Sequence, residues 1–80
     1  MDYPNIPTID LHGIADMALA LEQLERQLFS FYKKKQLCCR VVHGIGTGVL
    51  AAAVHRALTS NPLIKEWHEE ESGGSCMIYM

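Results

Sequence analysis

Apolar residues recur at three- and four-residue steps from Ile14 to about Lys35, the spacing that gathers side chains on one face of an α-helix. That apolar face comprises Ile14, Met17, Ala18, Leu21, Leu24, Leu28 and Phe31. Asp16 is positioned to cap the start of this helix, and the lysines at 33–35 lie where positive charge stabilises a helix C-terminus. The pattern therefore predicts an amphipathic helix over about 14–35.

A second, shorter helical pattern covers about Gly48 to Thr59. Its apolar face comprises Val49, Leu50, Ala53, Val54, Ala57 and Leu58. The sequence "SNP" at 60–62 follows, and it combines turn-forming residues with a proline that cannot continue a helix. We therefore expect two helices, each with one buried face.

The segment "TIDL" at 8–11 alternates apolar and polar residues, as a half-buried β-strand does. This alternation places Ile9 and Leu11 on one face and Asp10 on the other. His12 follows directly and points to the same side as Asp10. The first strand therefore ends in a pair of polar side chains that share a face.

Three further segments have the composition of strands. "LCCRVVH" at 37–43 is apolar on both faces, which is typical of a central strand covered by helices. "LIKEWHEE" at 63–70 and "SCMIYM" at 75–80 are expected to pair as a hairpin through the Ser-Gly-Gly loop at 72–74. These segments complete the set of elements.

The resulting order, β-α-β-α-β-β, predicts a two-layer α/β sandwich. Its mixed, mostly parallel four-stranded sheet would carry two helices and an antiparallel last strand. Eighty residues suffice for one compact domain, which we place at 8–80 after an extended lead-in at 1–7. A right-handed crossover would set the first two strands parallel and bring their carboxyl ends to the same sheet edge, where open α/β sheets bind ligands.

Composition excludes several classes of protein. The net charge of −2 provides no general attraction to nucleic acid, so any such contact must be local. No apolar run has the length of a membrane span or a signal-peptide core, and the three cysteines show no C-x-x-C spacing. We therefore expect a cytoplasmic protein, without membrane attachment, whose cysteines are small buried hydrophobes.

Two histidines outside the main motifs have no ligand spacing between them. His55 neighbours Arg56, and His68 lies among glutamates, so both are expected on the surface. No pair of histidines or cysteines shows the tight spacing of a zinc site, so no metal ligand is predicted. Trp67 and Tyr79 could stack on bases, but packing against the sheet is the preferred interpretation.

The stretch "VVHGIGTGVL" at 41–50 combines a strand end, three glycines and a helix start. The spacing G-x-G-x-G matches neither the dinucleotide motif nor the nucleoside-triphosphate loop, so nucleotide cofactors are disfavoured. Backbone N–H groups exposed at a helix N-terminus can bind a phosphate. The alternative is that the glycines satisfy only a left-handed turn.

Three side chains are candidates for proton transfer at this sheet edge. His12 is the candidate general base or acid. Asp10 could orient its imidazole, bind a divalent cation such as Mg²⁺ or Mn²⁺, or cap the turn at Gly13. His43 could be a second proton-transfer group or a hydrogen-bonded structural residue. Arg40 could supply positive charge to a phosphate nearby.

Five segments together resemble the Smr domain, the small MutS-related domain found at the C-terminus of MutS2. They are "DLHG" at 10–13, "VVHGIGTGVL" at 41–50, "AVH" at 53–55, "NPLIKEW" at 61–67 and the ending "GGSCMIYM". The resemblance covers about Ile9 to Tyr79. It implies a compact α/β sandwich, with endonuclease or nicking activity on DNA or RNA in several members. Other members resemble non-catalytic modules that bind nucleic acid or the ribosome.

The family motifs transfer onto single positions of this chain. The D-x-H motif falls on Asp10 and His12. The H-G-x-G-x-G motif falls on His43, Gly44, Gly46, Thr47 and Gly48. Ala51 departs from the family, because many MutS2-type sequences carry arginine or lysine there, and a phosphate contact is lost with it.

Two functional hypotheses follow: a weak endonuclease, and a non-catalytic module that binds nucleic acid or the ribosome. In both, the chain is expected to act as a monomer. A third option is an adaptor that binds protein partners through the edge of the hairpin. If His12 and His43 form an acid–base pair without metal, the substrate that suits them best is RNA, because its 2′-hydroxyl is an internal nucleophile.

Overall fold

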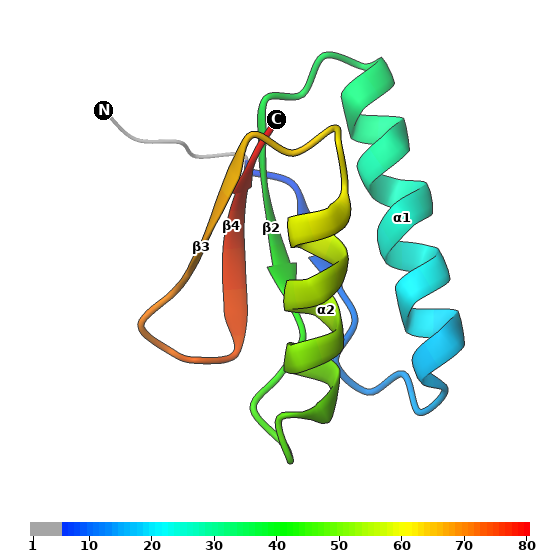
Figure 1. The fold of residues 1–80 in the computed structure, drawn as a ribbon, viewed down its shortest axis with the longest axis vertical. Coiled ribbons are helices and arrows are strands. Elements are labelled where there is room, and N and C mark those ends of the chain that lie inside the picture. The colour runs from blue at the N-terminus through cyan, green and yellow to red at the C-terminus, as the bar shows by residue number, and fades with distance from the viewer. Residues whose placement is uncertain (1–5) are drawn as a thin grey trace.

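The computed structural model describes residues 6–80 and contains two helices packed on one four-stranded sheet (Figure 1). The elements are β1 (Thr8–Asp10), α1 (Met17–Lys33), β2 (Cys38–Val42), α2 (Val49–Ser60), β3 (Glu66–Glu69) and β4 (Ser75–Tyr79). The predicted order β-α-β-α-β-β and the two-layer α/β fold are therefore confirmed. Most of the lead-in expected at 1–7 lies outside the described residues.

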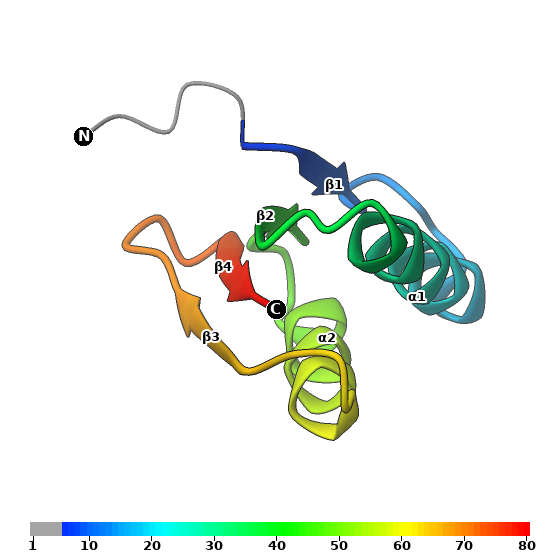
Figure 2. The same ribbon diagram turned by 90° about the horizontal axis from the view of Figure 1, so that it is seen from above.

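The sheet has the strand order β1-β2-β4-β3. β1 and β2 are parallel, whereas β4 is antiparallel to both of its neighbours, β2 and β3. Three strands therefore run in one direction and the last strand runs against them, as the sequence predicts. Both helices cover the same face of the sheet (Figure 2).

The core lies between that sheet face and the two helices. Its members, each at most 8% exposed, are Ile9, Leu11, Leu24, Leu28, Cys39, Val41, Val54, Leu58, Cys76, Ile78 and Met80. Two details of the predicted helix faces are wrong: Ala18 and Val49 are exposed. Ala20 is buried in the first helix instead, one turn before Leu24 on the same inward face.

Helix α1 begins at Met17 because Asp16 caps it, as predicted. The Asp16 carboxylate accepts hydrogen bonds from the backbone N–H groups of Ala18 and Leu19, at 2.9 and 3.3 Å. These N–H groups have no partner within the helix, so the cap satisfies them. The helix therefore starts three residues after the predicted Ile14, at the capped position.

The parallel pairing of β1 and β2 positions the candidate site. Asp10 is the register partner of Val42, and the N–H of Leu11 extends the pairing by donating to the Val42 carbonyl at 2.7 Å. His12 and His43 consequently leave the sheet at one edge, which is also where both helices begin (Figure 1). The prediction of a shared edge is confirmed. Among the described residues, neither helix is long and apolar enough to cross a membrane.

Replacing Asp16 by alanine tests the cap. We expect Asp16→Ala to lower the free energy of unfolding by about 1 kcal/mol, because two N–H groups lose their acceptor. Urea denaturation of wild type and variant measures the change. Glu25→Ala, at an exposed position in the same helix, is the matched control and should cost less than about 0.5 kcal/mol. Equal stabilities of the two variants would contradict the assigned cap.

Candidate functional site

A pocket of about 290 Å³ lies where β1 and β2 end and α2 begins. Its lining residues are His12, Gly13, His43, Gly44, Ile45, Gly46, Thr47, Gly48, Leu50 and Ala51. The two sequence motifs, separated by some thirty residues of helix and strand, thus meet in one cavity. The pocket walls are formed mainly by backbone and small side chains.

The glycine loop presents unpaired backbone donors at the start of α2. Gly48 is the N-cap residue, with φ of 86°, and it has no side chain to cap the helix. Within residues 6–80, the Thr47 hydroxyl accepts a hydrogen bond from Val49 N–H at 3.4 Å, whereas the N–H groups of Leu50 and Ala51 have no acceptor. Free N–H groups at the positive end of a helix can bind an anion.

Gly44 allows the two motifs to approach closely. Its φ of 81° lies in the left-handed region, and a Cβ at this position would be 3.4 Å from the Cβ of His12. The N–H groups of His43 and Gly44 both donate to the Gly74 carbonyl, each at 2.9 Å. The loop is therefore anchored to the β3–β4 hairpin on one side and packed against His12 on the other.

Asp10 and His12 form an exposed carboxylate–imidazole pair. His12 Nδ1 lies 3.1 Å from Asp10 Oδ1, which also accepts the backbone N–H of His12 at 3.1 Å. Because a carboxylate accepts hydrogen bonds, we assign the hydrogen to Nδ1, which leaves Nε2 unengaged by Asp10. The hydrogen bond from the His12 side chain, followed by that from its backbone, lowers the pKa of Asp10 below its ordinary value.

His43 lies deeper and uses both of its ring nitrogens. Its residue surface is 4% exposed. Nδ1 lies 2.7 Å from the Gly44 carbonyl oxygen and donates to it, and Nε2 lies 3.7 Å from Cys76 Sγ. The geometry favours the structural alternative for His43, a residue that holds the loop, over a proton-transfer role.

The structure does not bring Arg40 to the pocket. Its guanidinium binds the Glu70 carboxylate through two hydrogen bonds, at 2.8 and 3.1 Å. This pairing raises the pKa of Arg40 and lowers that of Glu70. Arg40 also points to the sheet face opposite the helices, since Cys39 and Val41 on either side of it are buried beneath them. We therefore leave Arg40 out of the phosphate site.

His55, expected on the surface, is only partly exposed, with 26% of its side chain accessible. Its ring stacks on Trp67 with centroids 4.7 Å apart and meets the His43 ring edge-on at 5.4 Å. Trp67 packs against the core and donates its indole N–H to Thr59 at 3.3 Å, which agrees with the packing interpretation. His68, by contrast, is exposed and paired with Glu66, as expected.

The cysteines behave as the composition predicts. Burial raises the pKa of Cys39 to about 12 and that of Cys76 to about 11. Both are therefore neutral thiols at physiological pH. Cys38 is half-buried, and among the described residues no cysteine forms a disulfide.

Fold and pocket together define a class of protein: a two-layer α/β domain in which a D-x-H motif and a glycine loop meet at the ends of parallel strands. The family model for the Smr domain matches residues 9–80, so the chain belongs to the Smr domain family. The resemblance seen in the sequence is thereby confirmed. The Smr domain of Thermus thermophilus MutS2 has the same fold, with a TM-score of 0.85, 24% identity and coverage of 92% of this chain and 96% of that one.

Curated relatives are longer than this chain. The ribosome rescue factor SmrB of Shewanella baltica is 33% identical over 79 residues, which make up 96% of this chain and 44% of the relative. The SmrB of Shewanella oneidensis is 34% identical over 79 residues, again 96% of this chain and 44% of the relative. The chain therefore spans less than half the length of these relatives.

Removing the His12 side chain should change the titration of Asp10. In His12→Ala the side-chain hydrogen bond is lost and the backbone one remains, so the pKa of Asp10 should rise part of the way to its ordinary value. Because the folded pKa is lowered, the contact stabilises the fold at neutral pH and loses that effect as pH falls through the Asp10 pKa. Carboxyl ¹³C NMR titration measures the shift. His68→Ala is the control, and an unchanged Asp10 pKa in His12→Ala would refute the pairing.

Proposed function

We propose that this domain binds a backbone phosphate of nucleic acid in the glycine-loop pocket and cleaves the adjacent phosphodiester bond as a weak endonuclease, with RNA as its preferred substrate. The observation that carries this proposal is the exposed Asp10–His12 pair at the rim of a pocket whose helix N–H groups lack acceptors. The pair supplies a base, and the pocket supplies a place for the anion.

The pocket suits a phosphate better than a base or a sugar. The unpaired N–H groups of Leu50 and Ala51 are donors only, and the α2 macrodipole adds partial positive charge at the same point. None of the lining side chains carries a carboxylate that would repel an anion. Binding of one phosphate there would place the neighbouring ribose near the rim, which His12 forms.

The cleavage step uses the free nitrogen of His12. Nε2 accepts the proton of the ribose 2′-hydroxyl, whose oxygen forms a bond to phosphorus. The bond from phosphorus to the 5′ oxygen breaks, that oxygen takes a proton from water, and His12 returns its proton to solvent. The products are a 2′,3′-cyclic phosphate and a 5′-hydroxyl. Asp10 holds the imidazole in the tautomer that this step requires.

We assign His43 a positioning role in this scheme. Donation from Nδ1 to the Gly44 carbonyl holds the loop at 2.7 Å. Its other nitrogen faces Cys76 and is thus directed away from solvent. A proton-transfer role for His43 would require that contact to break.

A divalent cation is not required by this proposal. Mg²⁺ and Mn²⁺ prefer several oxygen ligands, and none of the residues that line the pocket carries a carboxylate. Such an ion would have to take its remaining ligands from water and substrate phosphate. Asp10 already accepts two hydrogen bonds from His12, which suits it better to orienting the imidazole.

The names of the relatives support RNA as the substrate. SmrB is called a ribosome rescue factor, and this chain matches 44% of its length. A ribosome-bound RNA, met in the cytoplasm, is accordingly the partner that we propose. We also propose that the domain acts as a monomer, since one chain contributes both the base and the phosphate pocket.

A second candidate is a non-catalytic module that binds ribosomal RNA. Two observations favour it: the net charge of −2, and the absence of a cationic side chain among the residues that line the pocket. Both indicate weak phosphate binding that a larger assembly would have to strengthen. Cleavage assays separate the two candidates.

The first assay concerns His12. We expect pure protein to cleave a structured RNA in the presence of EDTA, and His12→Ala to lower the rate by about 100-fold or more, because the base is removed. Replacing the 2′-hydroxyl at the cleaved position by hydrogen should abolish cleavage. Labelled RNA on denaturing gels measures both effects, and His68→Ala is the control histidine variant.

Three outcomes would change the assignment. Cleavage abolished by EDTA and restored by Mn²⁺ would make Asp10 a metal ligand. A bell-shaped dependence of rate on pH, in place of a single rise to a plateau, would return His43 to the mechanism as the acid. No cleavage of RNA or DNA, with binding retained, would leave the non-catalytic module.

A matched pair of substitutions at Ala51 tests the phosphate pocket. We expect Ala51→Arg to tighten RNA binding and to steepen its salt dependence by about 0.7–0.9 in the log–log slope, as one added phosphate contact does. Ala51→Glu should weaken RNA binding because its carboxylate repels phosphate. The same carboxylate, in the first turn of α2, stabilises the helix, so weaker binding would not reflect a destabilised helix. Fluorescence anisotropy at several salt concentrations measures the RNA affinity and its salt dependence. Ala52→Glu, at a position outside the pocket, is the control. If Ala51→Arg, Ala51→Glu and Ala52→Glu bind RNA with the same affinity, the loop is not part of the binding site.

A further inference from the structure

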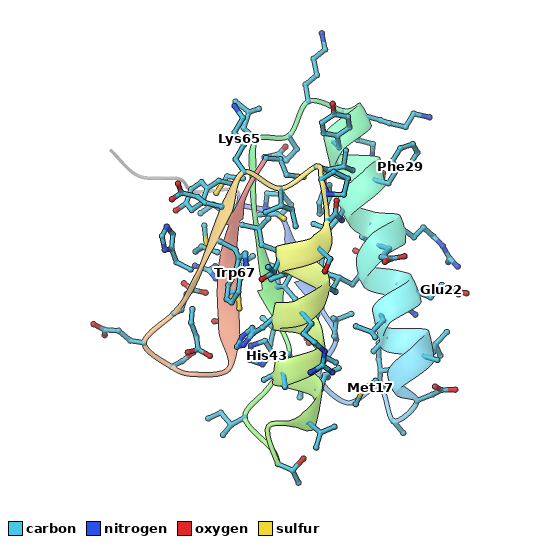
Figure 3. The ribbon with its side chains drawn as sticks, in the orientation of Figure 1. Met17, Glu22, Phe29, His43, Lys65 and Trp67 are labelled. Carbon is cyan, nitrogen blue, oxygen red and sulfur yellow. The ribbon has the colours of Figure 1, made fainter. Side chains whose placement is uncertain are left out.

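Three metal-ligating side chains meet beneath α2, beside the phosphate pocket. His43 follows β2, His55 lies in α2 and Cys76 lies in β4. One donor atom from each, an imidazole nitrogen or the thiol sulfur, lies within 4.8 Å of the other two. In Figure 3 the labelled side chains of His43 and Trp67 mark this region between the sheet and α2.

His43 is already oriented as a metal ligand. Histidines that bind metals usually donate their second ring N–H to a carbonyl or carboxylate, which fixes the tautomer and aims the remaining lone pair. His43 Nδ1 donates to the Gly44 carbonyl at 2.7 Å. The lone pair of Nε2 therefore points towards Cys76, whose sulfur is 3.7 Å away.

His55 supplies a buried nitrogen with no hydrogen-bond partner among residues 6–80. That atom is Nε2, and it is shielded from solvent. Glu69 Oε1 lies 3.4 Å from it, within ion-pair distance but without the alignment of a hydrogen bond. Stacking on Trp67 at 4.7 Å holds the ring in place. A buried polar atom without a partner is costly, and a bound cation would satisfy it.

We propose that His43, His55 and Cys76 bind a zinc-class dication, with the Glu69 carboxylate closing the fourth position. Glu69 is the cross-strand partner of Cys76, so the two side chains leave the sheet on the same face. Two nitrogens, one thiolate and one carboxylate are ligands typical of Zn²⁺ or Co²⁺ and disfavour Mg²⁺.

The separations suit a tetrahedral ion after a small contraction. Bond lengths of about 2.0–2.3 Å set neighbouring donor atoms roughly 3.3–3.6 Å apart. The contact of 3.7 Å between His43 and Cys76 and that of 3.4 Å between His55 and Glu69 already approach this range. The widest separation within the triad is at most 4.8 Å and needs to close by about 1 Å. Binding converts the Cys76 thiol to a metal-bound thiolate and releases one proton to solvent.

The position of the ion gives it a structural role. It would tie α2 to β2 and β4 and fix His43, which also borders the phosphate pocket. The catalytic pair, Asp10 and His12, does not take part. The site would therefore stabilise the fold and the glycine loop, and it stands independently of the proposed cleavage chemistry.

Titration of the whole chain with Zn²⁺ and Co²⁺ tests the proposal. We expect one Co²⁺ per chain with a thiolate-to-cobalt absorption band, displaced by Zn²⁺, and a rise in Tm of several degrees with Zn²⁺. Cys76→Ser should abolish the band. His55→Phe, which keeps a ring to stack on Trp67, should weaken Zn²⁺ binding by at least about tenfold in calorimetry.

Matched controls separate this site from adventitious binding. Cys38→Ser removes a half-buried thiol outside the cluster, and His68→Phe removes an exposed histidine, so both should bind like wild type. Absence of the cobalt band, or Zn²⁺ binding that survives in His55→Phe, overturns the proposal. Loss of Zn²⁺ binding in His12→Ala would also overturn the proposal, because it would assign the ion to the exposed Asp10–His12 pair. Circular dichroism checks each fold, and if Cys76→Ser is unfolded, His55→Phe decides.

Discussion

Everything at the candidate site depends on the parallel pairing of β1 with β2. The register that sets Asp10 against Val42 brings two chain segments off the sheet at the same edge. One carries His12 and the other carries the glycine loop, and both lead into helices. A slip of one residue would turn Asp10 into the core and Ile9 out of it, because side chains alternate between the faces of a strand. The hydrophobic core and the site therefore stabilise the same register.

The site combines polar groups of two kinds. Asp10 and His12 are exposed and satisfy each other, which leaves one imidazole nitrogen free towards solvent. Among the described residues, the N–H groups of Leu50 and Ala51 at the start of α2 have no acceptor, and Gly48 has no side chain to cap them. A helix such as α1, where Asp16 accepts the first N–H groups, cannot bind an anion in this way. The same physical rule for helix ends thus explains the capped terminus of α1 and the anion site that we propose at α2.

Burial separates the histidines of this small domain into different roles. His12 and His68 are exposed and lie beside carboxylates of their own strands or turns. His43 is buried and His55 is partly buried, and a buried imidazole nitrogen needs a hydrogen-bond partner. His43 finds its partners in Gly44 and Cys76, whereas the buried nitrogen of His55 has none among the described residues. That difference is the basis for the structural metal site that we propose beside the glycine-loop pocket.

Local sequence patterns were enough to predict both helices, all four strands, the Asp16 cap and the D-x-H and glycine motifs, because helix and strand periods and capping act over a few residues. They also placed the two motifs at one edge through the handedness of the crossover. Only the tertiary structure inserted β4 between β2 and β3, paired Arg40 with Glu70 and gathered His43, His55 and Cys76. These contacts join residues far apart in the chain, and such contacts leave no periodic signal in the sequence.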